Sequence, residues 1–229
     1  VGSEMCIRDR FDWYLKGVGE QPGLFVEIQS NQGQWRIEDR YPPDEMDTIS
    51  LDLGGAMMNV AGTTTIQPNG NFGPIYESEP FEEPIWISGL PRLHVDVSTA
   101  TVGGQIYALL EDCSEAGDCI HIGHAIMDLR YHEGGTQEQT WIPVFQTINA
   151  KMEFFAMDAQ IEAGHYLRLS LASTGEDYLP ASTSSIVQIS EGSSSNLILD
   201  TIQEGDKLLF DPPLCIHPYC LDWLNQTVE

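Results

Sequence analysis

The chain has 229 residues, enough for one large β-domain or two small ones, and its 41% hydrophobic content excludes global disorder. It carries 35 acidic residues against 10 basic ones, a net charge of −25. A surface this negative repels phosphate, which excludes nucleic acid and anionic lipid as default partners. The sequence has no run of 18 apolar residues that could span a membrane.

The first ten residues, VGSEMCIRDR, resemble the translated sequencing-adapter read-through found at the ends of metagenomic assemblies. We therefore predict that residues 1–10 are a non-native tail in which Cys6 has no role. The next stretch, FDWYLKG at 11–17, is typical of the last turns of a helix that ends with Gly17 at the C′ position. This stretch is expected to be a short helical remnant.

Strand signals begin after this remnant. The segments LFVEIQS and QWRIEDR surround an Asn-Gln-Gly sequence at 31–33, which predicts a hairpin. We expect residues 11–47 to form a connection and the first strands. The segment TISLDLG at 48–54 alternates apolar and polar residues, as in a half-buried strand, whereas residues 61–75 are rich in Gly, Thr, Asn and Pro and predict an irregular connection.

The stretch from Tyr76 to Ala172 carries most of the remaining pattern. It contains at least four β-type runs separated by Gly, Pro and Ser, and it has no convincing amphipathic helix. This pattern is typical of an all-β fold, a β-sandwich or jelly roll, which we place over residues 48–206. Residues 207–229 are expected to form a C-terminal tail.

Six segments of this sequence occur together in a characteristic order. They are FDWYLKG, WRIEDRYPP, YESEPFEEPIWISGLPRLHVDVST, IYALLEDC, IHIGHAIMDLRYHEGG and IEAGHYLRLSLAST. In this order, from about Phe11 to Ile202, the chain resembles the C-terminal domain of the CocE/NonD hydrolases, the group that includes cocaine esterase and the Xaa-Pro dipeptidyl-peptidases. The resemblance implies a jelly-roll β-sandwich similar to galactose-binding modules, packed on an α/β-hydrolase domain.

The resemblance also places this chain after the catalytic machinery, because the family's Ser, Asp and His all precede the FDWYLKG-like segment. The residues agree: the sequence has no G-x-S-x-G nucleophile elbow, and the serines at 193–195 follow a single glycine outside that context. We therefore expect no catalytic residue, no cofactor and no metal in this chain. The expected partner is an upstream α/β-hydrolase domain, and a homodimer of the parent enzyme is a further possibility.

Four cysteines form two close pairs, Cys113 with Cys119 and Cys215 with Cys220. The first pair brackets a glycine-containing turn between two predicted strands, where opposite positions suit a disulfide. We prefer two local disulfides, which would indicate an oxidising, extracytoplasmic compartment. Free thiols are one alternative, and a structural calcium ion is another open question for so acidic a chain.

A zinc site is the sharper alternative for the first cysteine pair, because His121 and His124 follow Cys119 closely. Strand geometry argues against it: positions 121 and 124 have opposite parity, so a regular strand would send the two imidazoles to opposite faces. The other histidines in predicted strands, His94 and His165, are expected to be a solvated and a structural residue, respectively.

Aromatic residues are expected to serve packing. Trp86, Tyr107, Trp141, Phe154 and Phe155 lie in or beside apolar runs and are predicted to be core or seam residues. A separate group lies near the N-terminus, where the missing hydrolase domain would be met. We predict that an inter-domain seam is formed by Phe11, Trp13, Leu15 and Trp35.

The leading functional prediction is therefore a non-catalytic C-terminal β-sandwich of a serine α/β-hydrolase, an esterase or Xaa-Pro dipeptidyl-peptidase. In it, the domain packs on the catalytic domain and helps to shape its substrate pocket. The alternative is a carbohydrate- or ligand-binding jelly-roll module, which would need a row of exposed aromatic rings on one sheet face.

Overall fold

The structure is a computed structural model, in which the chain forms two compact units, Val1–Asp44 with Gly205–Glu229, and Glu45–Glu204. The described residues are 11–19, 26–68, 70, 73–132, 139–175, 178–181 and 185–203. The predicted non-native tail at 1–10, most of the C-terminal region, and the cysteines Cys6, Cys215 and Cys220 lie outside these residues. We describe each unit by itself.

The described residues of the first unit form a helical turn and a hairpin. The turn is a π-helix, η1 (Asp12–Lys16), and it ends at Gly17, whose φ of 67° is left-handed, as predicted for a glycine at this position. Strand β1 (Val26–Gln29) pairs antiparallel with β2 (Trp35–Glu38). The hairpin predicted around residues 31–33 is thus confirmed.

The second unit is built almost entirely of strands. Its elements are β3 (Asp47–Leu53), β4 (Met57–Asn59), β5 (Thr65–Ile66), β6 (Ile75–Ser78), β7 (Ile85–Gly89), β8 (Arg92–Thr99), β9 (Gln105–Cys113), β10 (Cys119–Asp128), the 3₁₀ turn η2 (Leu129–Tyr131), β11 (Ile148–Glu153), β12 (Met157–Ile161), β13 (Tyr166–Ala172), β14 (Val187–Ser190) and β15 (Gly192–Ile202).

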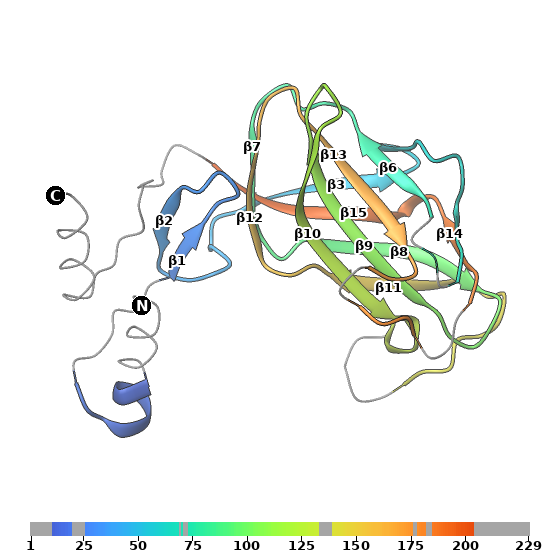
Figure 1. The fold of residues 1–229 in the computed structure, drawn as a ribbon, viewed down its shortest axis with the longest axis horizontal. Coiled ribbons are helices and arrows are strands. Elements are labelled where there is room, and N and C mark those ends of the chain that lie inside the picture. The colour runs from blue at the N-terminus through green and yellow to red at the C-terminus, as the bar shows by residue number, and fades with distance from the viewer. Residues whose placement is uncertain are drawn as a thin grey trace. The chain divides into compact units, whose positions relative to one another are not determined.

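These strands form one hydrogen-bonded network that folds into two layers. The path runs β10-β9-β13-β6-β4-β3-β15-β8-β14-β5, with β11 joined to β8, and β7 joined to β12 and β15. Except for the short parallel bridge between β3 and β4, the pairs are antiparallel. In Figure 1, β10, β9 and β13 cross over β3, β15 and β8. This arrangement confirms the predicted all-β sandwich.

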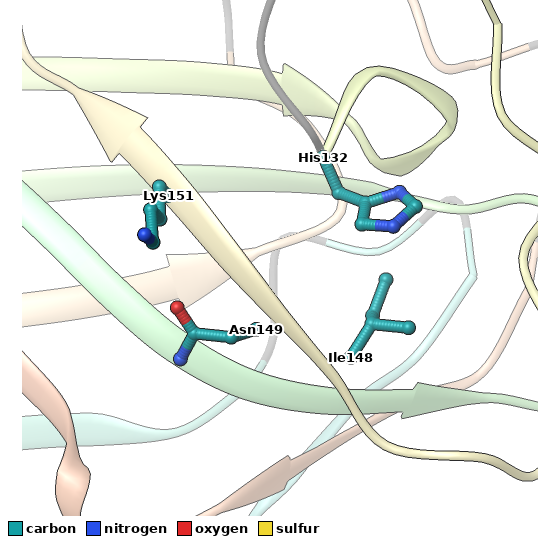
Figure 2. Close-up of a pocket in the computed structure, with 4 residues that line it drawn as sticks. All are labelled: His132, Ile148, Asn149 and Lys151. Carbon is teal, nitrogen blue, oxygen red and sulfur yellow. The ribbon is translucent and has the colours of Figure 1, made fainter.

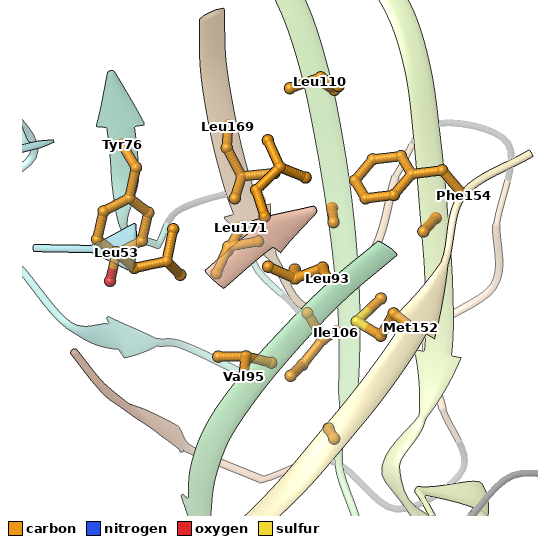
Figure 3. Packing of buried hydrophobic residues seen from close by; sticks show 14 of the residues in the cluster. Leu53, Tyr76, Leu93, Val95, Ile106, Leu110, Met152, Phe154, Leu169 and Leu171 are labelled. Carbon is orange, nitrogen blue, oxygen red and sulfur yellow. The ribbon is translucent and has the colours of Figure 1, made fainter. Parts of the chain in front are cut away.

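The core lies between the two layers because both contribute every second side chain to it. Strand β8 buries Leu93 and Val95 fully, and β9 buries Ile106 and Leu110 fully. Figure 3 shows these side chains meeting, with the Phe154 ring beside Leu110. Each such side chain contributes about 1.5–3 kcal/mol when it leaves water, so this alternation is what drives the strands into a sandwich.

Not every aromatic residue packs as the sequence suggested. Trp86 and Phe154 are 4% and 1% exposed, as expected of core residues. Phe155 and Trp141 are not core residues, because their exposed fractions are 60% and 76%, so for them only the seam prediction stays open. Phe155 points outward because it directly follows the inward-facing Phe154. Trp141 lies in the connection between η2 and β11, outside the regular strands.

Candidate functional site

Strands β9 and β10 form a hairpin, and a disulfide links them at the turn. Cys113, the last residue of β9, pairs in register with Cys119, the first residue of β10, and the two sulfur atoms are bonded. The turn between them is tight: the Ser114 amide donates to the Asp118 carbonyl at 2.9 Å, and Gly117 has a φ of +86°. Antiparallel register brings these two cysteines opposite each other, which is the geometry that the sequence suggested.

We predict that breaking this bridge lowers stability modestly. Because the closed loop is short, the Cys119→Ala variant should lose about 2 kcal/mol of unfolding free energy. Urea denaturation of the oxidised wild type, the reduced wild type and the variant measures the effect. The reduced wild type should match the variant. An oxidised protein whose two cysteines still titrate as free thiols would contradict the assignment.

A β-bulge makes His121 and His124 neighbours, so the parity argument used on the sequence is wrong. The register on β9 jumps between His121 and Gly123, which leaves Ile122 as an extra residue. The two histidines then lie opposite Glu111 and Leu109, which share one face. Nδ1 of His124 is 3.3 Å from Nε2 of His121.

This arrangement nevertheless does not make zinc ligands of Cys113, Cys119, His121 and His124 together. The two cysteine sulfurs are used in the disulfide. Among the residues described here, no group of three or more His, Cys, Asp or Glu side chains is close enough to hold a metal ion. Three protein ligands are the usual minimum for catalytic zinc, and structural sites use four.

An aromatic cluster surrounds His124 on the outer face of β9 and β10. Nε2 of His124 lies 2.9 Å from the Tyr178 hydroxyl, and its ring is 5.0 Å from that of Phe155 and 5.8 Å from that of Tyr107. The interplanar angles, between 32° and 64°, show rings tilted against one another. A sugar-binding platform needs coplanar exposed rings, so this cluster gives little support to a carbohydrate-binding module.

The residues of a catalytic triad are not assembled around His165. Its Nδ1 is 2.8 Å from Oδ1 of Asp112, a carboxylate that is nearly buried. This pairing joins β9 to the start of β13, as expected of a structural histidine. The serine cluster has other partners: the Ser195 hydroxyl donates to the Ser190 carbonyl and accepts from the Asp96 amide, and the Ser194 hydroxyl donates to the Asp96 carboxylate at 2.6 Å. These serines hold the bulged start of β15 against β8.

A shallow depression of about 470 Å³ lies along β11. Its lining side chains are His132, Ile148, Asn149 and Lys151, which Figure 2 shows around the strand. The Asn149 amide donates to Asp96 at 2.7 Å, and His132 Nδ1 contacts the Leu129 carbonyl at 2.9 Å. The depression is open to solvent, and the polar groups of Asn149 and His132 are engaged in these contacts, so it does not enclose a ligand as a typical binding pocket does.

The pKa of His94, on β8 beside this depression, is lowered by burial first, then by the positive charges of Lys151 and Arg92. Lys151 is the cross-strand partner of His94. Below a pH of about 6.5 the unfolded chain binds a proton that the folded domain takes up less readily. His94 therefore lowers stability as the pH falls through this value.

We predict that the Lys151→Met variant raises the pKa of His94 toward its ordinary value, without reaching it, because the burial remains. NMR titration of the imidazole measures this shift. Lys16→Met is the matched control, since Lys16 instead pairs with Asp12 in η1. An unchanged His94 pKa in Lys151→Met would show that Lys151 does not act on it.

The four predicted seam residues all lie in the first unit. Phe11 and Leu15 are 56% and 75% exposed, and Trp13 and Trp35 are half-buried. The exposed group extends to Tyr14, at 58%. Apolar side chains this exposed on a single helical turn leave a surface that another body could cover. The seam stays a prediction, which the first unit alone does not test.

The described residues of the second unit form a β-sandwich of mostly antiparallel strands. Residues 16–203 match the family model of the X-Pro dipeptidyl-peptidase C-terminal non-catalytic domain, and the chain belongs to this family. The resemblance to the C-terminal domain of the CocE/NonD hydrolases is thus confirmed. No curated protein sequence matches the chain.

Solved structures share this fold at low sequence identity. A CocE/NonD family hydrolase from Staphylococcus aureus has a TM-score of 0.64 at 13% identity, over 87% of this chain and 46% of that one. An aminopeptidase from a marine sediment archaeon, Thaumarchaeota archaeon, has a TM-score of 0.61 at 11% identity, over 87% and 44%. An α-amino acid ester hydrolase has a TM-score of 0.55 at 13% identity, over 86% and 44%. The chain therefore spans less than half the length of these proteins.

In the part of the chain that the structure describes, no helix is long and apolar enough to cross a membrane.

Proposed function

We propose that this domain serves a serine α/β-hydrolase of the esterase or Xaa-Pro dipeptidyl-peptidase type. It packs on the upstream catalytic domain and helps to shape its substrate pocket. The observation that carries the proposal is the match of residues 16–203 to a family described as C-terminal and non-catalytic. Because the chain covers only 44–46% of the solved structures that share its fold, there is ample room for a catalytic part outside it.

The exposed apolar turn of the first unit supports the packing role. Phe11 and Leu15 precede the hairpin and the sandwich in the sequence, and both side chains are exposed. Burying a leucine or phenylalanine side chain contributes about 1.5–3 kcal/mol, which is a useful contribution to an inter-domain seam. Dimerisation of the parent and an extracytoplasmic location belong to the same proposal.

The test is to recover the reading frame upstream of Phe11, express the longer protein, and compare it with the present chain. We expect the upstream part to supply a nucleophile elbow, an aspartate and a late histidine. We expect ester or Xaa-Pro substrate turnover by the longer protein and none by the chain alone. Serine-dependent turnover by the isolated chain would overturn the proposal, as would an upstream sequence without hydrolase motifs.

A further inference from the structure

Four connecting segments meet where β8 ends and β9, β11 and β14 begin. We call this surface the loop end and define it as residues 99–104, 140–147, 178–181 and 185–186. Hydrogen bonds join its segments: the Phe145 amide donates to the Thr99 carbonyl at 2.9 Å, and the Ala100 amide donates to the Ile186 carbonyl at 3.3 Å. The Leu179 carbonyl accepts from Gln105, the first residue of β9, at 3.4 Å.

Large apolar side chains are unusually exposed at the loop end. The exposed fractions are 89% for Leu179, 78% for Phe145, 76% for Trp141, 43% for Ile186, 39% for Val144 and 38% for Val102. Scattered apolar residues are normal on a protein surface, but six on adjoining segments are not. Trp and Phe in such a position are the residue types that anchor protein interfaces.

The four segments of the loop end contain no charged residue. One residue in five of this chain is charged, and in the sequence Glu138, Glu176 and Asp177 lie within two residues of these segments. By contrast, the solvent-facing turn between β9 and β10 contains Glu115 and Asp118. An end of the sandwich that faced only water would be expected to share the acidic character of the chain. Depletion of charge in an apolar patch is instead typical of an interface core.

Phe145 adds a third observation from its backbone. Its φ is 60°, and it is the only described residue other than glycine with a positive φ. For a bulky side chain this conformation costs about 1–2 kcal/mol. The conformation belongs to a turn in which the Gln146 amide donates to the Pro143 carbonyl at 3.2 Å, and the Phe145 amide is held by the Thr99 carbonyl. The turn directs the ring outward, where 78% of the residue is exposed, as expected of an aromatic anchor at an interface.

We infer that the loop end is a docking surface for the catalytic domain, with Trp141, Phe145 and Leu179 as its apolar anchors. This inference rests on the proposed function and names the surface that performs it. The occupant is the catalytic domain rather than a second copy, because more than half the length of the structures sharing this fold lies outside the matched part. An uncharged patch also lets an acidic domain approach a neighbour without repulsion across the contact.

Hydroxyl-radical footprinting of the isolated chain and of the longer protein tests the inference without any substitution. Trp141 and Phe145 should be labelled several-fold more slowly in the longer protein. Met58, which is 58% exposed on β4 outside the loop end, serves as the internal control and should keep its rate. Unchanged labelling of Trp141 and Phe145 in the longer protein would overturn the inference.

A variant carrying Trp141→Gln, Phe145→Asn and Leu179→Gln complements the footprint. Asparagine tolerates the positive φ, so the isolated variant should melt at the wild-type temperature or above, while the longer protein should melt lower. The matched control carries Met58→Gln, Val60→Thr and Ile120→Thr at residues that are 58%, 50% and 53% exposed, and it should leave both proteins unchanged. An equal loss in the isolated chain would assign the three residues a structural role and overturn the inference.

The remaining outcomes separate this inference from the proposed function. If the upstream sequence encodes no hydrolase, the proposed function fails, and this inference fails with it. If the longer protein is a hydrolase whose loop end stays labelled while Leu15 and Trp13 become protected, only this inference fails. If Trp141 becomes protected in the isolated chain as its concentration rises, the occupant is a second copy, and the inference is wrong.

Discussion

The Phe154→Ala variant should lose about 3–5 kcal/mol of unfolding free energy, a large part of the 5–15 kcal/mol that holds a typical domain together. Phe154 is 1% exposed, and its ring packs beside Leu110 in the core (Figure 3). Its backbone is held as well, since its amide donates to the Pro91 carbonyl at 2.8 Å. Removing the ring leaves a cavity that the two layers of the sandwich cannot close.

The neighbouring residue provides the control. Phe155→Ala removes the same ring from a residue that is 60% exposed, where it contacts the His124 ring. We expect this variant to lose less than about 1 kcal/mol. Urea denaturation of both variants measures the difference. Equal losses, or a larger loss for Phe155→Ala, would contradict the assignment of Phe154 to the core and of Phe155 to the surface.

The second large effect is expected from Gly73→Ala. A Cβ atom at residue 73 would meet the backbone carbonyl oxygen of Leu171, which cannot rotate away as a flexible side chain could. The neighbouring Pro74 carbonyl accepts the Leu171 amide at 2.9 Å, so separating the two segments also strains this hydrogen bond. We expect a loss of about 2–3 kcal/mol, at the upper part of the range for overpacking.

Gly55→Ala is the matched control for this substitution. A Cβ atom at residue 55 would approach only Asp52, with its Cβ at 3.4 Å and its carbonyl oxygen at 3.6 Å, which are ordinary contacts. Because alanine restricts the unfolded chain more than glycine does, this variant should be neutral or slightly stabilising. Thermal unfolding of the two variants distinguishes them, and a stable Gly73→Ala protein would rule out the close approach between Gly73 and Leu171.

Local patterns in the sequence were sufficient to predict the fold class. The apolar residues of Arg92–Thr99 recur at every second position, and the structure buries each of them on one face of β8. Gly17 adopts the left-handed conformation expected at a helix end, and the turn at 31–33 joins two paired strands. Each of these features depends on residues that are close together in the chain, so a short stretch of sequence is enough to predict it.

The surface features depended on tertiary structure. The bulge at Ile122 reverses the face of His124, because a strand's parity counts only as long as its partner keeps register. Strand β11, with the sequence INAKME, has only a weak pattern and was not anticipated; it forms because β8 offers an edge to pair with. The exposure of Trp141 and Phe145 depends on how the connections between distant strands are placed in the fold, which no local sequence pattern determines.

The sequence alone therefore determined an all-β fold, since alternation and turn residues are local properties, and the resemblance carried by its motifs indicated the CocE/NonD type. Which side chains meet across the layers, and which are left facing outward, is determined by the register of strands far apart in the chain. The loop end becomes visible only when four such strand ends come together. For that reason its proposed contact with a catalytic domain could not be inferred before the fold was known.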